Sequence, residues 1–270
     1  MAIETRERSG RGAVLTVFGA KGGIGKTTIA TNLAACVAQA GLQVIVMDME
    51  TQYGDVAGLM GIEPRYTVVD LALRATELDQ RALERALLQH ESGALVLAAP
   101  SVADWAQVTT EQVARVVQVA SEHADLMVLD TPGTFNDLVA TALVEADAVL
   151  AVSSLQMASV RHTAEMLDLL EAEGYPQERL RLILNQIAPE IMVTPEDVEA
   201  IVGHRVFWSI PYSAQVPKST SSGVPIVLAN PKTDTAKQLR GLAERLTGVR
   251  VPDRNLRSIL RPGHLLRRAS

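Results

Sequence analysis

The chain has 270 residues, of which 47% are apolar, and its formal net charge is −6. This length and apolar content suit one α/β domain with a large core, and the acidic balance excludes a protein that coats nucleic acid over its whole surface. Cys36 is the only cysteine, which excludes an internal disulfide and a cysteine-rich metal site. The sequence has neither a secretory signal nor an apolar run of about 18 residues, so we expect a cytoplasmic protein.

Short apolar segments, each typical of a strand, recur along the chain. Their continuous rather than alternating apolar character indicates strands covered on both faces. Helical periodicity follows at 27–41, at 109–124 and at 194–203, where Thr194 is the expected N-cap and Gly203 the expected end. This order predicts an α/β fold with a doubly wound, mostly parallel sheet, helices on both faces, and a ligand at the carboxyl ends of the strands. The predicted strands are 13–18, 44–48, 94–100, 126–130, 148–154, 180–185 and 205–210.

The segment "GAKGGIGKT", from Gly19 to Thr27, fits the phosphate-binding pattern G-x-x-x-x-G-K-[ST]. It lies between a predicted strand and a predicted helix, as this motif requires. Its glycines let backbone N–H groups turn toward phosphate oxygens, and the helix N-terminus adds positive charge. We predict that Lys26 binds the β and γ phosphates; a glycine-rich turn that binds nothing is the structural alternative. The predicted nucleotide-binding residues of the loop are Gly22, Gly23, Ile24, Gly25, Lys26, Thr27 and Thr28.

Two predicted strands end in aspartate, at Asp48 and at Asp130. Because the carboxyl ends of parallel strands meet at one edge of the sheet, both carboxylates should face the phosphate loop. A carboxylate there can hold Mg²⁺ directly or through water, and the Thr27 hydroxyl can bind the same ion. We therefore predict Thr27, Asp48 and Asp130 as the metal ligands. A capping role for Asp130 is the structural alternative.

A second lysine, Lys21, is not needed by the geometry of the loop. As a long flexible cation it could reach a phosphate on another subunit, or it could be an ordinary solvated lysine. The sequence "KGGIGKTT" resembles the deviant Walker A motif of the MinD and ParA ATPases, which are P-loop NTPases of the SIMIBI type. In that family the first lysine crosses a two-fold interface to the partner's nucleotide. The resemblance implies an ATP-dependent homodimer, with Mg²⁺ as cofactor and Lys21 and Lys26 as catalytic residues.

The resemblance covers both switch segments. "DTPGTFND" resembles the second switch, which implies that Asp130 is the catalytic Walker B acid and that Gly133 lies near the γ phosphate. The first switch, 48–61, has Glu50 where the family usually has an aspartate that orients the attacking water. Misplacing a catalytic group by ~1 Å can lower a rate about 10²-fold. We therefore expect Glu50 to position water and hydrolysis to be slow, unless the backbone adjusts to the longer side chain.

For the base, the family uses an asparagine after a later strand and backbone groups near a proline. Asn185 in "LILNQ" and Pro211 in "SIPY" match these positions, although an asparagine there is often only a turn former. The resemblance runs from about Gly12 to Leu246. Within it, "TQYGDVAGLMG" and "PIVLANPKT" look most like the CpaE and TadZ proteins, which place pilus or secretion machinery at cell poles. MinD, the septum-positioning branch, is the next closest match.

We divide the chain into a polar N-terminal extension (1–12), an ATPase domain (13–247) and a basic C-terminal tail (248–270). In the tail, arginines accompany Leu256, Ile259 and Leu260 at helical spacing. This pattern suits an anionic membrane surface and resembles the membrane-targeting helix of MinD in position. A solvated tail and non-specific DNA contact are the alternatives.

Together these features predict an ATP-dependent dimerising switch ATPase that positions a cellular assembly, either pilus or secretion machinery or a division site. Its expected partners are a second copy of the chain and an unidentified assembly or activator protein, and its expected location is the cytoplasm or the inner face of the cell membrane. Two alternatives remain: a ParA-like partition ATPase that binds DNA non-specifically, and an ATP-binding scaffold with little turnover.

Overall fold

The computed structural model describes residues 10–191 and 193–253. Its strands are β1 (Ala13–Phe18), β2 (Val44–Asp48), β3 (Leu88–Gln89), β4 (Leu95–Leu97), β5 (Leu126–Asp130), β6 (Ala148–Ser154), β7 (Leu180–Asn185) and β8 (Val206–Ile210). Its α-helices are α1 (Lys26–Gln39), α2 (Val56–Leu59), α3 (Val68–Ala72), α4 (Gln80–Ala86), α5 (Thr110–Glu122), α6 (Asp137–Glu145), α7 (Met157–Ala172), α8 (Pro195–Val202), α9 (Gln215–Ser221), α10 (Ile226–Ala229) and α11 (Asp234–Thr247). Short 3₁₀ helices are η1 (Ala75–Glu77), η2 (Asp104–Gln107) and η3 (Gln177–Arg179).

Within these ranges the strands form one sheet in the order β3-β4-β2-β5-β1-β6-β7-β8. All neighbouring strands are parallel except β3 and β4, which form an antiparallel hairpin. The predicted mostly parallel sheet is therefore confirmed. The chain continues from β1 to β2 on one side of β1 and later places β6 on the other side. In such sheets the ligand binds outside the carboxyl ends of the strands at this reversal.

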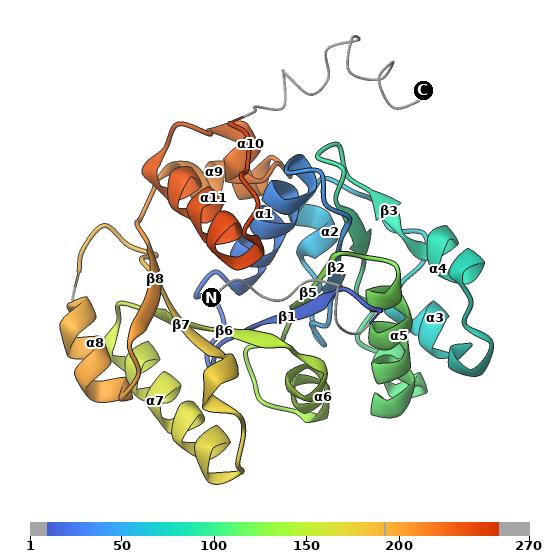
Figure 1. The fold of residues 1–270 in the computed structure, drawn as a ribbon, viewed down its shortest axis with the longest axis horizontal. Coiled ribbons are helices and arrows are strands. Elements are labelled where there is room, and N and C mark those ends of the chain that lie inside the picture. Colours follow the sequence, from blue (N-terminus) through green and yellow to red (C-terminus); the bar gives the residue numbers. More distant parts are fainter. Residues whose placement is uncertain (1–9, 192, 254–270) are drawn as a thin grey trace.

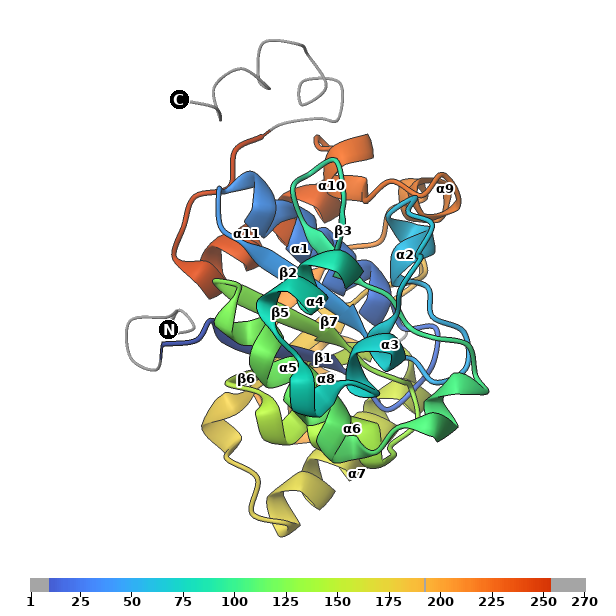
Figure 2. The ribbon, with the colours of Figure 1, turned by 90° about the vertical axis from the view of Figure 1, so that its right-hand side faces the viewer.

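Helices cover both faces of the sheet (Figure 1). On one face, α1, α10 and α11 pack against a cluster that includes Leu15 and Val17 of β1. On the other face, α3 to α5 and α6 to α8 pack against two clusters that include Val14 and Phe18. Figure 2 shows α1, α10 and α11 separated by the strands from α6 and α7. Because successive side chains of a strand point to opposite faces, β1 contributes to both cores, which is why it is apolar throughout.

Most predicted elements match the structure, and one strand is wrong in extent. The helix from Pro195 begins after Thr194, whose side chain caps it, and ends at Gly203 in the left-handed conformation, as predicted. The strand predicted over 94–100 is shorter, because β4 covers only Leu95–Leu97. Directly after β4, Ala98 forms an isolated bridge with Thr67, and its carbonyl accepts a hydrogen bond from the N–H of Val68 at 3.0 Å. The chain therefore leaves the sheet to hold the start of α3.

The predicted terminal segments lie largely outside the described residues. Residues 1–9 and 254–270, which include Leu256, Ile259 and Leu260 of the basic tail, are not described. The division of the chain into extension, domain and tail therefore stays a prediction. At the last described residues, Val251 is buried and its N–H donates to Glu244 Oε1 at 2.8 Å. In the described part of the chain, no helix combines the length and apolar character that a membrane crossing requires.

One buried histidine stabilises the turn between β3 and β4. His90 is 6% exposed, and its Nδ1 accepts a hydrogen bond from the N–H of Ser92 at 3.1 Å and lies 2.8 Å from the Ser92 hydroxyl. Because Nδ1 accepts from an N–H group, the neutral ring is the form that fits. Burial lowers the pKa of His90 to about 4.

We predict that His90 makes the stability of the fold depend on pH. An unfolded histidine has a pKa of about 6.5. Between pH values of about 4 and 6.5 the unfolded chain therefore binds more protons than the folded chain, and the free energy of unfolding contributed by His90 rises with pH. In urea titrations, the stability difference between the natural chain and His90→Asn should grow across this window, by at most about 3 kcal/mol. The exposed histidine variant His162→Asn is the control, and equal pH slopes for all three chains would contradict this role.

Candidate functional site

The phosphate loop connects β1 to α1 and leaves the N-terminus of α1 without a side-chain cap. Gly25 is the N-cap residue with φ 91°, a left-handed conformation that favours glycine. The first turn of α1 also has no acidic residue. Helices α5, α6 and α8, by contrast, begin with a side chain that accepts a backbone N–H. The first N–H groups of α1 are therefore available to an anion.

Lys26 lies in the first turn of α1 and is 7% exposed. Its Nζ donates to the carbonyl oxygen of Lys21 at 3.2 Å. Burial lowers the pKa of Lys26, while the charges of Asp130 and Glu50 oppose this effect. A buried ammonium group with one neutral hydrogen-bond acceptor is well placed to exchange that acceptor for a phosphate oxygen.

Asp48 and Asp130 lie side by side, because β2 and β5 pair in parallel with these residues in register. Each is 1% exposed. Asp48 accepts the N–H of Glu50 at 2.9 Å and the N–H of Val56 at 3.0 Å, and burial raises its pKa to about 6. Burial, followed by the charge of Asp48, raises the pKa of Asp130 well above its usual range. The structure thus brings the two predicted carboxylates together at one edge of the sheet.

The oxygen atoms at this edge fit a divalent cation. The Thr27 side chain is near enough to Asp130 to lower the pKa of that carboxyl group, which places its hydroxyl beside the carboxylates. The Oδ1 atom of Asp130 is buried and has no hydrogen-bond partner among the described residues. The same part of the chain has no group of three or more His, Cys, Asp or Glu side chains suited to a metal. An ion at this point would therefore take its remaining ligands from phosphate and water, as Mg²⁺ commonly does.

Glu50 lies two residues beyond Asp48 and is half-buried. Its carboxylate oxygen Oε1 accepts the N–H groups of Thr51 at 2.9 Å and Gln52 at 3.2 Å. Its carbonyl oxygen accepts a hydrogen bond from Trp105 Nε1 at 3.0 Å. The carboxylate is close enough to influence Lys26 and Asp130 electrostatically, but its hydrogen bonds are to its own loop.

The loop after β5 packs directly against the phosphate loop. A Cβ atom at Gly133 would lie 2.7 Å from the backbone nitrogen of Gly22 and 3.0 Å from the carbonyl carbon of Lys21, so only glycine fits without displacing the phosphate loop. Lys21 itself is half-buried. In the described ranges, no hydrogen bond or ion pair of its ammonium group is found, in contrast to Lys26.

A cavity of about 370 Å³ opens beside the phosphate loop. Asn185 and Pro211, which come from the ends of β7 and β8, both line it. The side-chain nitrogen of Asn185 donates to the carbonyl of Ile24 at 2.8 Å and so ties β7 to the phosphate loop. The volume is in the range of small-ligand pockets. The other lining residues are Gly23, Gly25, Thr28, Ile29, Gln186, Ile187, Ile210, Tyr212, Ser213, Val216, Pro217, Thr220, Ser221, Thr235 and Leu239.

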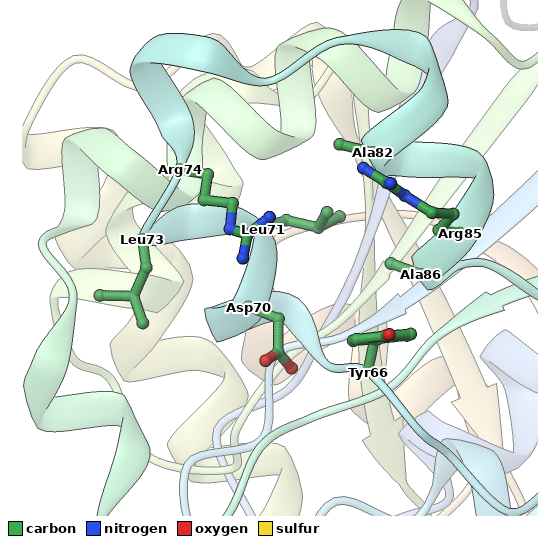
Figure 3. A pocket seen from close by; sticks show the side chains of 8 residues that line it. All are labelled: Tyr66, Asp70, Leu71, Leu73, Arg74, Ala82, Arg85 and Ala86. Carbon is green, nitrogen blue, oxygen red and sulfur yellow. The ribbon is translucent and has the colours of Figure 1, made fainter.

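A second cavity, of about 250 Å³, lies between α3 and α4 (Figure 3). The guanidinium groups of Arg74 and Arg85 extend over it, and the ring of Tyr66 lies at its border. None of the predicted site residues lines this cavity. It is therefore separate from the phosphate loop. Its complete lining is Tyr66, Asp70, Leu71, Leu73, Arg74, Ala82, Arg85 and Ala86.

Two residues near the site were missed by the sequence analysis. Tyr212 follows Pro211 directly and lines the cavity of about 370 Å³, and its place after a strand could have indicated this role. Trp105 contacts the backbone of Glu50 from 55 residues away. No local pattern identifies such a pair, because the contact depends on how β4 and η2 pack beside β2.

Comparison with known proteins agrees with this geometry. The family model described as "AAA domain" matches residues 12–172. A septum site-determining protein MinD from Thermotoga maritima is 25% identical over 251 residues, which are 90% of this chain and 91% of that protein. The ParA family ATPase from Chlorobium tepidum has a TM-score of 0.80 at 21% identity, covering 87% of this chain and 98% of the other. MinD from Pyrococcus horikoshii, solved with Mg-ADP, has a TM-score of 0.75 at 19% identity, covering 86% and 94%.

The family model covers more than half of the chain, and the whole fold resembles those of the structural relatives, with TM-scores of 0.80 and 0.75. The "KGGIGKTT" sequence follows β1 and opens α1, as the deviant Walker A motif requires. The chain therefore belongs to the MinD/ParA family of P-loop ATPases.

Proposed function

We propose that this protein binds Mg-ATP, dimerises around it, hydrolyses it slowly, and thereby positions a larger cellular assembly. The observation that carries the proposal is the cluster of Lys26, Thr27, Asp48 and Asp130 beside the uncapped N-terminus of α1. Buried charges of either sign are costly unless opposite charges and hydrogen bonds compensate them, and the protein itself compensates Asp130 only in part. A triphosphate with its cation is a ligand that compensates both.

The chain's own residues supply the binding and positioning. Backbone N–H groups of the phosphate loop and of α1 receive the phosphates, and Lys26 transfers its hydrogen bond from the carbonyl of Lys21 to a phosphate oxygen. Thr27, Asp48 and Asp130 would hold Mg²⁺, which neutralises charge on the phosphates when bound. Glu50 orients the water that attacks the γ phosphate. The cavity that contains Asn185 and Pro211 accepts the base.

Two observations support dimerisation through the edge of the sheet that carries the phosphate loop. The ammonium group of Lys21 is without a partner in the described residues, so it is available to a phosphate bound by a second copy. Several large apolar side chains that follow the carboxyl ends of parallel strands are also exposed, and such side chains are common in interfaces. They are Tyr53 at 79%, Val102 at 55%, Phe135 at 41%, Met157 at 41% and Tyr212 at 36%.

The positioned assembly is inferred from the family. The relatives named above include septum site-determining proteins, which supports a role at a division site, and pilus or secretion machinery is the other candidate. We propose that an assembly or activator protein binds the dimer, in the cytoplasm or at the inner face of the membrane. Contact of the arginine-rich tail with anionic lipid, or with DNA as in a partition ATPase, rests on residues outside the described ranges.

A scaffold that holds ATP with little turnover is the second candidate. The observation that favours it is the pair of hydrogen bonds from the Thr51 and Gln52 N–H groups to the Glu50 carboxylate. A carboxylate occupied by its own backbone is less available to a water molecule. Nucleotide binding and dimerisation can persist under these conditions, because phosphoryl transfer depends on positioning that binding does not need.

The role of Lys21 is tested by measuring mass in solution. Light scattering should detect a dimer with ATP and Mg²⁺ but a monomer with ADP, and Lys21→Ala should weaken the ATP dimer at least about tenfold, since one charge-assisted contact per active site is lost. The exposed lysine variant Lys232→Ala should dimerise like the natural chain. A dimer that forms without nucleotide and ignores Lys21 would contradict the proposed interface.

The weakened-enzyme and scaffold candidates are separated by Glu50→Asp. If the extra methylene misplaces the carboxylate, shortening it should raise the steady-state phosphate release by about 10- to 100-fold without changing nucleotide affinity. Glu63→Asp, at an exposed position, is the matched control. Absence of turnover in both the natural chain and Glu50→Asp would support the scaffold, and equal measurable turnover would refute the misplacement argument.

The metal site is tested by Asp130→Asn. Removing one of two adjacent buried carboxylates relieves their repulsion, so the nucleotide-free variant should melt higher than the natural chain, by about 3 °C. The additional thermal stabilisation that Mg²⁺ gives to ADP-bound protein should disappear in the same variant. Asp168→Asn on the exposed face of α7 should change neither quantity. A lower melting temperature for Asp130→Asn without nucleotide would show that the carboxylates are compensated within the protein.

A further inference from the structure

We propose that Trp105 is a positioning residue that holds the main chain of Glu50 through its indole N–H. The inference rests on the proposed hydrolysis of ATP with Glu50 as the water-orienting residue. Trp105 belongs to η2, between β4 and α5, and lies outside the phosphate loop and both switch segments. Its Nε1 donates to the Glu50 carbonyl at 3.0 Å.

Both backbone polar groups of Glu50 are held by side chains. The N–H of Glu50 donates to Asp48 Oδ1 at 2.9 Å, and its carbonyl accepts from Trp105. The preceding N–H, of Met49, donates to the carbonyl of Asp130 at 2.9 Å. The backbone is therefore attached to the metal-binding edge on one side of Glu50 and to η2 on the other. The other two bonds are made to Asp48 and Asp130, which are predicted metal ligands. Only the bond from Trp105, among these three, involves no predicted metal ligand.

The anchor itself is buried, whereas the loop that follows Glu50 is open to solvent. Trp105 is 9% exposed and belongs to the apolar cluster that includes Met47, Met49 and Leu71. Gln52, Tyr53, Gly54 and Asp55 are all exposed. Without the indole bond, the peptide group after Glu50 would be joined only to this exposed loop. The direction of the Glu50 side chain would then be determined by the loop rather than by the core.

The chain contains a matched control for this contact. Trp208 of β8 also donates its Nε1 to a backbone carbonyl at 3.0 Å, that of Gln238, at the far end of the sheet. Replacing either tryptophan by phenylalanine removes one indole N–H and leaves an aromatic ring. Trp208 is half-buried, whereas Trp105 is buried. A difference between Trp105→Phe and Trp208→Phe therefore reports the location of the bond rather than the loss of an indole N–H as such.

The first measurement is ATP hydrolysis with kcat and KM determined separately. Trp105→Phe should lower kcat by about tenfold, because a small displacement of a catalytic group is costly, and should leave nucleotide affinity unchanged. Trp208→Phe should keep the natural kcat and KM. Equal kcat values for the natural chain and Trp105→Phe would overturn the proposal. A parallel loss of nucleotide affinity in Trp105→Phe would also overturn it, because Trp105 would then support the whole pocket.

The second measurement does not depend on turnover. Hydrogen exchange of the peptide that contains residues 49–56 should be faster in nucleotide-free Trp105→Phe than in the natural chain and in Trp208→Phe. If the natural chain hydrolyses no ATP, the proposed enzymatic function fails. Hydrogen exchange still decides in that case whether Trp105 holds the loop. Unchanged exchange in Trp105→Phe would overturn the proposal. Should Trp105→Phe fail to fold, benzothienylalanine at position 105 removes the N–H with nearly the same ring shape, and the same outcomes apply.

Discussion

Repulsion between two buried carboxylates constrains the structure around the phosphate loop. Asp48 and Asp130 are brought into register by the pairing of β2 with β5, and both are removed from water. Backbone N–H groups compensate Asp48, and Lys26 and Thr27 compensate Asp130 in part. The Oδ1 atom of Asp130 still lacks a partner among the described residues. A cation at this atom would relieve the repulsion, and phosphate would in turn satisfy Lys26, which links metal and nucleotide binding.

The parts of the site differ in how firmly the fold holds them. Asp48 and Asp130 end central strands, and the phosphate loop is attached to β7 through Asn185 and to the loop after β5 through the close approach of Gly133. Glu50, by contrast, begins an exposed loop. The proposed binding groups therefore belong to the sheet and the loop attached to it, and the proposed water-positioning group belongs to a segment with its own attachments. This separation lets hydrolysis change without a change in nucleotide affinity, which suits a protein whose bound state acts as a signal.

The same edge of the sheet carries both the proposed nucleotide site and the surface proposed for the second copy. Apolar side chains such as Tyr53 and Phe135 follow the strands that carry Asp48 and Asp130. Any shift of these loops on nucleotide binding would also shift the exposed apolar side chains. Ligand and interface are thus joined through short segments of backbone, and no long-range pathway is needed to connect them.

Much of the fold and most of the candidate site could be predicted, because the signals were local. The run "AVLTVF" followed by "GAKGGIGKT" identifies a buried strand and a phosphate loop within fifteen consecutive residues. The placement of Asp48 beside Asp130 needed one further rule, that parallel strands present their carboxyl ends at one edge. The short β3 and β4 were less predictable, since the chain leaves the sheet at Ala98 to pair with Thr67, a contact between distant segments.

By itself, the sequence determined the family, the order of strands and helices along the chain, and the residue types available to phosphate and metal. Only the tertiary structure decided that Glu50 is held by Trp105, that Asn185 contacts Ile24, and that the Lys21 ammonium has no partner in the described ranges. The physical reason is the separation of the interacting groups along the sequence. Periodicity and motifs report only interactions between residues a few positions apart. A hydrogen bond between groups 55 or 161 positions apart exists only after the sheet has assembled and the layers have packed.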